Sequence, residues 1–400
     1  MVTNTADVEK LVYGGEGLAR QDGQVVLIPF VLPGEKVSIT TSRVKTGLLR
    51  GSLVELVEAS PERIAPRCEY FADCGGCHLQ HAGYAFQLEQ KSAILRETLR
   101  RIGGISYEAD IPILSAEPWF YRNRVQLHFE DRKCGFHRAG SHDIRPIEHC
   151  EIAAPVLVDA IRTLQTAAKR PEWPRFLRSL EIFTNGSQIQ LNVLDSNRPV
   201  AVRFFEWMKT LLPAMADGTI EYQAAGHTFR IGRGSFFQTN RFLIDALVNE
   251  VVASARGDQA IDLYAGVGLF SLPLARRFRL VDAVERGGSA FRDLEWNAIQ
   301  GGSTNITPRR ASAEEFLRGL DGAPEWIVAD PPRAGLGPDA TAELLRLKPA
   351  RLTIVSCDPT TLARDLRKLT TGGFQIARLT LVDLFPQTYH FETVAHLEPG

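Results

Sequence analysis

Residues 262–270 read Asp-Leu-Tyr-Ala-Gly-Val-Gly-Leu-Phe and connect a strand-like apolar run to a helical pattern. Gly266 and Gly268 let the backbone approach a ligand closely where the helix begins, and Asp262 can accept hydrogen bonds from that ligand. The third glycine of a dinucleotide-binding fingerprint would fall at Ser271, so that fingerprint is incomplete. The stretch predicts a cofactor site at the first strand-to-helix connection of an α/β sheet.

Strand-like runs alternate with helical segments from about residue 240 to the end of the chain. The runs are 259–263, 280–284, 326–329 and 352–355. This alternation predicts a parallel sheet with helices on both faces, and we expect a Rossmann-like domain over residues 236–400. Ligands of such sheets bind outside the carboxyl ends of the strands.

A carboxylate or a thiol directly follows three of these runs. Glu285 ends the second run, where it can accept both hydroxyls of a ribose. Asp330 opens the turn Asp-Pro-Pro-Arg, and Cys357 lies in Ser-Cys-Asp-Pro. A free cysteine is most often a small buried hydrophobe. The position of Cys357 at a strand end favours a catalytic interpretation instead, because the carboxyl ends of parallel strands meet in one crevice.

The glycine loop, Glu285 and the Asp330-Pro-Pro turn together resemble S-adenosylmethionine-dependent methyltransferases. In amine methyltransferases the equivalent turn ends in an aromatic residue that stacks on the target base. Arg333 stands there in this chain. The exchange indicates chemistry other than methylation of an exocyclic amine.

Six cysteines are present; Cys68, Cys74 and Cys77 lie together, and Cys150 follows far downstream. The N-terminus lacks the features of a signal peptide, and no apolar run approaches the ~18 residues of a membrane span, so we expect a cytoplasmic protein. Clustered cysteines in that compartment indicate a metal site rather than disulfides. Structural zinc usually takes two Cys-x2-Cys pairs, and the single pair here favours a [4Fe–4S] cluster over zinc.

The chain before the Rossmann-like part divides into an all-β part and a mixed part. Residues 1–60 hold short strand-like runs between turn-rich segments, and five such strands would close into an OB-like barrel, a common oligonucleotide binder. Residues 61–235 begin with the cysteines, continue with an amphipathic helix expected over 84–101, and end in an α+β pattern. We expect them to form a central α+β domain that holds the metal site.

The net charge of −1 gives no global sign of a nucleic-acid partner, although a local basic patch can supply one. Basic residues do gather in the central domain, where a solvated strand face is an equally good interpretation. They are Arg122, Arg124, Arg132, Lys133, Arg138 and Arg145.

Taken together, the motifs resemble the RNA uridine-5-methyltransferase family, and within it the iron–sulfur members with an N-terminal TRAM domain that methylate 23S ribosomal RNA. The resemblance spans nearly the whole chain. It rests on residues 14–17, 32–35, Cys68, 74–81, Cys150, 235–240, 262–268, 330–335, 355–359 and Glu392.

The resemblance implies S-adenosyl-L-methionine and a [4Fe–4S] cluster as cofactors and RNA as the substrate. Cys357 would be the nucleophile and Glu392 the base. Contacts with the cofactor or the target base would come from Gln238, Tyr264, Glu285 and Asp330, besides Asp262, Gly266 and Gly268 of the loop. Ser312 stands where the family has an acidic or amide residue. Two further departures are Asp358, where the family often has Asn, and Gln387, where it often has His.

The two residues suit the chemistry of uracil C5, which is too weak a nucleophile to attack a methyl sulfonium unaided. Addition of a thiolate at C6 makes C5 nucleophilic, and a base must later remove the C5 proton so that the thiol can leave. The target base must leave its stack to reach such a site, which favours a loop or single-stranded RNA.

Other functions remain open from the sequence alone. A redox enzyme that combines the cluster with a nicotinamide predicts a third glycine where Ser271 stands. An RNA-binding module without activity predicts loss of Cys357 or Glu392, and both are present. Transfer RNA remains an alternative substrate to ribosomal RNA. We expect a monomer with no membrane partner.

Overall fold

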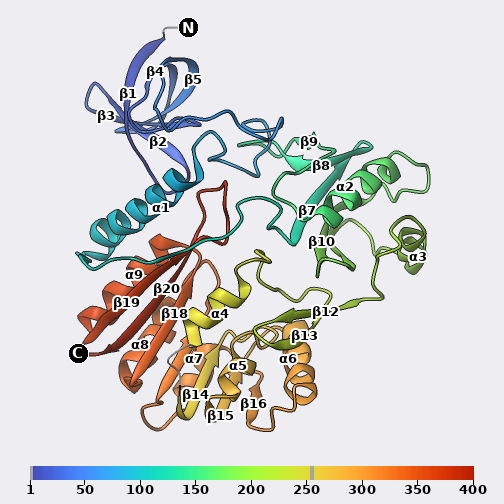
Figure 1. The fold of residues 1–400 in the computed structure, drawn as a ribbon, viewed down its shortest axis with the longest axis vertical. Helices are drawn as coiled ribbons and strands as arrows, with labels where there is room; N and C mark the ends of the chain where they lie inside the picture. Colours follow the sequence, from blue (N-terminus) through green and yellow to red (C-terminus); the bar gives the residue numbers. More distant parts are fainter. Residues whose placement is uncertain (1–2, 253–255) are drawn as a thin grey trace.

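The computed structural model describes residues 3–252 and 256–400. Along the chain, a small β-barrel is followed by a long helix, a central antiparallel sheet and a large α/β sheet (Figure 1). Among the described residues, no helix combines the length and the apolar character needed to cross a membrane.

The barrel closes in the strand order β1-β2-β3-β5-β4. Alternate residues point inward, as Val26 and Ile28 of β3 and Val37 and Ile39 of β4 do, and they form its core. The barrel predicted for residues 1–60 is confirmed, with residues 1–2 of that range outside the described part. The strands are β1 (Asn4–Leu11), β2 (Glu16–Gln21), β3 (Gln24–Pro29), β4 (Lys36–Lys45) and β5 (Leu48–Glu58).

The helix α1 (Tyr84–Thr98) continues as one π-helical turn, η1 (Leu99–Gly103), and ends at Gly104 with φ +66°. The helix expected over 84–101 is therefore present. Its buried face is less apolar than an amphipathic helix predicts, because it carries Gln87 and Lys91 beside Ile94 and Leu95. Buried polar side chains need partners, and those of α1 lie in a distant loop.

The central sheet has the strand order β11-β10-β7-β8-β9, and its neighbours are antiparallel. Leu127 and Leu180 of the sheet and Leu157 and Leu164 of the covering helix α2 belong to one core. The α+β pattern expected here is confirmed. The elements are β7 (Arg124–Glu130), β8 (Lys133–His137), β9 (Ile144–Pro146), α2 (Pro155–Ala168), β10 (Leu177–Thr184), β11 (Ile189–Ser196), α3 (Val202–Leu211) and the hairpin β12 (Thr219–Ala224) and β13 (His227–Gly232).

The large sheet has the strand order β16-β15-β14-β17-β18-β20-β19-β6. Its strands are β6 (Ile113–Leu114), β14 (Gly257–Leu263), β15 (Phe278–Val284), β16 (Ile306–Arg309), β17 (Trp326–Ala329), β18 (Arg351–Ser356), β19 (Phe374–Val382) and β20 (Glu392–Pro399). The first five strands in this order are parallel. Four of them correspond to the predicted runs, and β16 is an addition to them. The expectation of a parallel sheet fails at β20, a strand that the sequence analysis did not include and that is antiparallel to both neighbours. The loop 383–391 joins β19 to β20 without a crossover helix, and only antiparallel neighbours can be joined in this way.

Helices cover both faces of this sheet, as expected (Figure 1). Ala260 and Val328 pack in one core with residues of α4 and α6, whereas Ile261 and Ile327 pack in another with residues of α8 and α9. Each of these side chains contributes about 1.5–3 kcal/mol when it is fully buried, alanine less. The helices are α4 (Ile244–Val252), α5 (Ser271–Ala275), α6 (Gly288–Gln300), α7 (Ala313–Arg318), α8 (Gly337–Leu347) and α9 (Pro359–Thr371).

Candidate functional site

The predicted site residues gather at one edge of the large sheet. The neighbouring parallel strands β14, β17 and β18 are followed directly by Tyr264, Asp330 and Cys357, and β15 is followed by Glu285. The chain runs outward from β14 to β16 and then returns to β17 on the other side of β14. Such a reversal of strand order opens a ligand-binding crevice at the carboxyl ends of the strands.

Glu392 reaches the same edge from the opposite direction. It is the first residue of β20, which is antiparallel to β18 with Ser356 paired to Thr393. The residue after Ser356 is Cys357 and the residue before Thr393 is Glu392, so the two lie across from each other. The antiparallel strand that the sequence did not predict is what brings the thiol and the carboxyl together.

The thiol of Cys357 is held in its neutral form in the absence of a substrate. Burial raises the pKa of Cys357 to about 12, the Glu392 carboxylate adds to the rise, and the Arg333 guanidinium opposes it. The thiol is only partly exposed, and loss of its proton near neutral pH requires a change in its surroundings.

Asp358, the acid beside Cys357, is engaged elsewhere. It caps the N-terminus of α9, and its Oδ1 accepts hydrogen bonds from the backbone N–H groups of Thr360 (2.8 Å) and Thr361 (3.0 Å). It therefore raises the pKa of Cys357 less than Glu392 does. Asn and Asp serve equally well as N-caps, worth about 1 kcal/mol, which accounts for the departure from the family pattern at this position.

Buried carboxyl groups lie near one another at this edge of the sheet. Glu392 is 5 % exposed, and its Oε2 atom has no hydrogen-bond partner among the described residues. Burial and the nearby Asp330 raise the pKa of Glu392 well above its ordinary value. Burial, followed by the charge of Asp262, raises the pKa of Asp330 to about 7. Gln238 reaches this group from its own loop, and its Nε2 donates to Asp330 Oδ2 at 3.4 Å.

The glycine loop has the backbone that the sequence predicts. Tyr264, Gly266 and Gly268 have φ values of +60°, +57° and +95°. Glycine suits the last position because a φ of +95° strains any L side chain, and a Cβ there would also lie 3.0 Å from Leu294 Cδ1. The Glu285 carboxylate bends back to the loop and accepts from the Gly266 N–H at 2.9 Å.

Asp262 and Ser312, two expected cofactor contacts, each form hydrogen bonds within the protein. The Asp262 Oδ2 atom accepts a 2.5 Å hydrogen bond from Ser271, the residue in place of the third glycine, while Oδ1 has no partner among the described residues. Burial raises the pKa of Asp262 to about 7. Ser312 forms a capping box with Glu315 at the start of α7, so its hydroxyl is already engaged.

The barrel adds a residue that the sequence analysis missed. Tyr13 lies in the turn between β1 and β2, and its hydroxyl donates to the Cys357 carbonyl oxygen at 3.3 Å. Its ring packs edge-on against Tyr389, with centroids 5.3 Å apart. At Gly15 in the same turn, a Cβ would lie 3.1 Å from His78 Cβ and 3.3 Å from Tyr389 Cβ. The sequence Tyr13-Gly14-Gly15 indicates a turn but gives no information about what the turn packs against.

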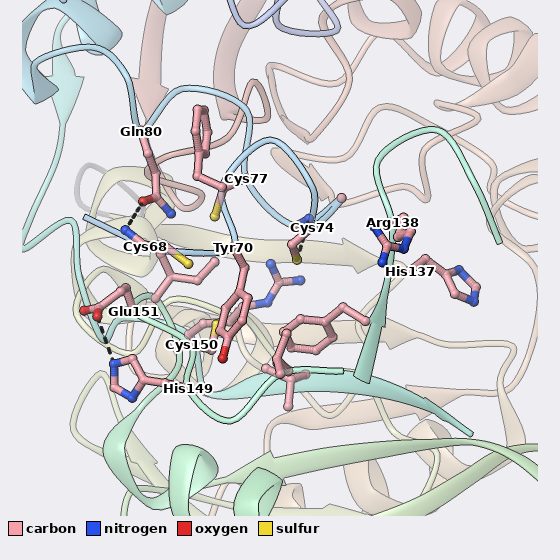
Figure 2. Close-up of a pocket in the computed structure, with 18 of the residues that line it drawn as sticks. Cys68, Tyr70, Cys74, Cys77, Gln80, His137, Arg138, His149, Cys150 and Glu151 are labelled. Atoms are coloured by element: carbon pink, nitrogen blue, oxygen red, sulfur yellow. Dashed lines mark hydrogen bonds and ion pairs between the residues drawn. The ribbon is translucent and has the colours of Figure 1, made fainter. Parts of the chain in front are cut away.

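The four predicted metal-binding cysteines line one cavity of about 320 Å³ between the segment 68–80 and the central sheet (Figure 2). They are Cys68, Cys74, Cys77 and Cys150. Of the other two cysteines, Cys134 is buried in the core of the central sheet and Cys357 lies in the crevice. Within the described residues, no group of three or more His, Cys, Asp or Glu side chains is placed to hold a metal ion.

A backbone N–H group points at one sulfur of this cavity. The Gly76 N–H donates to Cys74 Sγ at 3.4 Å, whereas the Ala153 N–H donates to the Cys150 carbonyl oxygen at 3.2 Å. Burial raises the pKa of Cys150 to about 11 and that of Cys77 further. Four such thiols become thiolates together only when a bound cation compensates their charge.

Two sequence families match different parts of the chain. The TRAM domain matches residues 3–54, and the tRNA (Uracil-5-)-methyltransferase family matches residues 214–399. A 23S rRNA (uracil(1939)-C(5))-methyltransferase of Edwardsiella ictaluri is 32% identical over 411 residues, which cover 96% of this chain and 93% of that protein. The chain belongs to the RNA uracil-C5 methyltransferase family. The predicted family, the TRAM barrel and S-adenosylmethionine-dependent methylation of RNA uracil C5 are thereby confirmed.

Other members of this family are similar over the same length. An uncharacterized RNA methyltransferase of Aquifex aeolicus is 31% identical over 427 residues, with 98% of this chain and 97% of that protein covered. The crystal structure of a tRNA (uracil-54, C5)-methyltransferase of Pyrococcus abyssi, in complex with S-adenosyl-L-homocysteine, superimposes with a TM-score of 0.75. It is 26% identical and covers 98% of this chain and 100% of that chain. These relatives include enzymes of ribosomal and of transfer RNA.

Proposed function

We propose that this enzyme methylates C5 of a uridine in 23S ribosomal RNA through a covalent bond between Cys357 and C6 of the base. The observation that carries the proposal is the pairing of β18 with β20, which sets Cys357 across from Glu392 beside the glycine loop. The full-length similarity to the ribosomal RNA enzyme of Edwardsiella ictaluri supports this substrate. The similarity to the Pyrococcus abyssi structure supports transfer RNA as the second candidate.

The chain's residues divide the reaction between them. The Cys357 thiolate adds to C6 of the uracil. Asp330 forms a hydrogen bond with the edge of the uracil ring as the negative charge moves toward C5. When bound, S-adenosyl-L-methionine supplies the methyl group that C5 takes up. Glu392 then removes the proton from C5, the C5–C6 double bond forms again, and the thiolate leaves.

The residues at the strand ends suit that cofactor. Glu285 directly follows β15, where it would accept ribose hydroxyls, and its Oε2 accepts from the Gly266 N–H of the glycine loop. The unpartnered Oδ1 of Asp262 offers a further buried acceptor. Gly268 keeps the loop free of side chain where a ligand approaches, and Tyr264 and Gln238 complete the set of contacts.

We further propose that the four cysteines hold a [4Fe–4S] cluster. Four sulfurs around one zinc lie within about 4 Å of one another, since Zn–S bonds measure about 2.3 Å. The described cysteines instead line an open cavity of about 320 Å³, with the Gly76 N–H directed at the Cys74 sulfur (Figure 2). A cluster needs more room than one ion and accepts such hydrogen bonds. Bound there, it would join the segment 68–77 to Cys150.

The three parts of the chain would share the work. Residues 1–60 and the central domain, residues 61–235, would bind the RNA, and residues 236–400 would carry the chemistry. The division is not complete, because β6 from the central range pairs with β19 of the large sheet. Ser312 would belong to the cofactor site because it follows the strand β16. Its hydroxyl, which caps α7, would not contact the cofactor.

The function is tested by methyl transfer to RNA transcripts that carry tritium at uridine C5. We expect one equivalent of tritium to be released per methyl group gained on 23S rRNA, and 5-methyluridine to be the product. A transfer RNA transcript serves as the comparison. Methylation of the transfer RNA alone would select the second candidate, and a product other than 5-methyluridine would contradict the proposal.

The cluster is tested by the metal content of protein purified without oxygen. We expect about four iron and four sulfide per chain. Cys77→Ser should lose most of the iron, because its sulfur is one of the four ligands. Cys134→Ser is the matched control, since that buried thiol lies outside the cavity. Zinc without sulfide in the wild type would disprove the assignment.

A further inference from the structure

The loop 383–391, which connects β19 to β20 and delivers Glu392, is unusually buried for a loop. Asp383, Gln387 and Phe391 are at most 2 % exposed. Connections normally run over the surface, where water satisfies their backbone groups. The buried groups of this loop need partners within the protein, and α1 and the cysteine segment provide them.

Gln87 of α1 binds the loop through both ends of its amide. Its Nε2 donates to Gln387 Oε1 at 3.0 Å, and its Oε1 accepts from the Gln387 backbone N–H at 3.1 Å. The same Nε2 also donates to the carbonyl oxygens of Leu79 and Ala82, each at 3.0 Å. One side chain therefore joins three segments: the helix, the end of the cysteine segment and the loop.

The cysteine segment contacts the loop directly. The backbone N–H groups of His78 and Leu79 donate to the Gln387 carbonyl oxygen at 2.9 and 3.0 Å. His78 follows Cys77, whose sulfur lines the cavity. Gln387 itself has φ +67°, a left-handed conformation that a non-glycine residue keeps only where its surroundings enforce it. The two hydrogen bonds between Gln87 and Gln387, together with the two from the cysteine segment, hold Gln387 in this conformation.

A buried ion pair fixes the other end of the loop. Lys91 Nζ lies 2.6 Å from Asp383 Oδ1, with both side chains 0 % exposed. Lys91 also donates to the Phe385 carbonyl oxygen at 3.1 Å, and Tyr84 donates to Asp383 Oδ2 at 2.8 Å. This loop thus supplies hydrogen-bond and ionic partners for the polar residues on the buried face of α1.

We propose that Gln87 and Gln387 are positioning residues for Glu392. Through these two glutamines, the cysteine segment affects release of the RNA adduct rather than its formation. The proposal rests on the proposed function. Cys357 is held by β18 and by the cap of α9, neither of which contains Gln87 or Gln387. Its contact toward the loop runs through Tyr13, whose hydroxyl bonds the Cys357 carbonyl oxygen and whose ring packs against Tyr389. In release, Glu392 takes the C5 proton, the C–H electron pair forms the C5–C6 double bond, and the C6–S pair returns to the Cys357 thiolate.

The test separates the two steps in the variant Gln87→Met, which keeps the side-chain length and removes the amide. Quenched-flow measurements on RNA follow adduct formation, and tritium loss from C5 follows release. We expect release to slow roughly 10- to 100-fold, as for other small misplacements of a reacting group, and formation to stay within about twofold. Glu89→Gln, an exposed site on the same helix, should leave both rates unchanged.

A second variant controls for the possibility that Gln87→Met disrupts the fold. Gln387→Asn tolerates the left-handed backbone but is too short to reach Gln87, so it should slow release similarly. Hydrogen exchange at the amides of 383–391 should be faster in both variants, while the iron content stays unchanged.

The outcomes distinguish this inference from the proposed function. Accumulation of the adduct in Glu392→Gln together with wild-type release in Gln87→Met would overturn the positioning role alone. An equal slowing of formation and release would also overturn it, since a general structural loss acts on both steps. Absence of any adduct in the wild type and in Glu392→Gln would overturn the proposed function and this inference with it.

Discussion

Cys357→Ala is expected to abolish methylation and every denaturant-resistant adduct with RNA. Without a thiolate at C6, the uracil ring has no route to a nucleophilic C5, so the rate should fall roughly 10⁴-fold or more. Binding of RNA should change little, because the barrel and central sheet are untouched. The measurements are methyl transfer to RNA and a denaturing gel of protein with labelled RNA.

Cys134→Ala is the control for this variant, because it removes a buried thiol from the central core and leaves the crevice intact. Its activity should match the wild type at a temperature below unfolding. Turnover by Cys357→Ala above a few per cent would remove the nucleophile role. The raised pKa of Cys357 adds a further expectation. Adduct formation should accelerate as the pH rises from neutrality, since the thiolate fraction grows tenfold per pH unit below the pKa.

Glu392→Gln is expected to stop the reaction one step later. Glutamine has the shape of glutamate but cannot take the C5 proton, so the methylated adduct should accumulate and turnover should fall about 10²- to 10⁴-fold. The first turnover should transfer its methyl group at near the wild-type rate. Gel-stable RNA-protein complex carrying labelled methyl, with its C5 tritium retained, is the diagnostic product.

The same variant should not weaken the fold. The Glu392 carboxyl is buried with an unpartnered Oε2, so an amide in its place removes no ion pair. Thermal unfolding is therefore expected at or above the wild-type temperature. Glu398→Gln changes an exposed residue of the same strand and should be silent in both assays. Normal turnover by Glu392→Gln without adduct would assign the proton abstraction to another group.

The parts of the fold governed by local pattern could be predicted. The barrel, four of the parallel strands and the glycine loop each follow from residues adjacent in sequence, so they were expected. The ends of the strand-like runs are enough to put Tyr264, Asp330 and Cys357 on one edge of the sheet. In a parallel sheet the carboxyl ends of the strands lie at the same edge, so this placement needs no information from distant segments.

Contacts across long sequence separations could not be predicted. The direction of β20 decides where Glu392 lies, yet an apolar run in sequence does not reveal strand direction. Gln87 and Lys91 looked like ordinary positions on a helix, because their partners are about 300 residues away. Buried polar residues on an otherwise regular helix are the signal that could have pointed to them.

The turn that carries Tyr13 and Gly15 limits how this enzyme could have been assembled in evolution. A barrel that served only as a tether could be exchanged for any other RNA-binding unit on a flexible linker. This one rests its tyrosine hydroxyl on the Cys357 carbonyl oxygen, and a Cβ at Gly15 would crowd His78 and Tyr389. We expect a replacement to work only if it offers a turn that fits the same surface, so the barrel would be exchanged together with the cysteine segment and the loop 383–391.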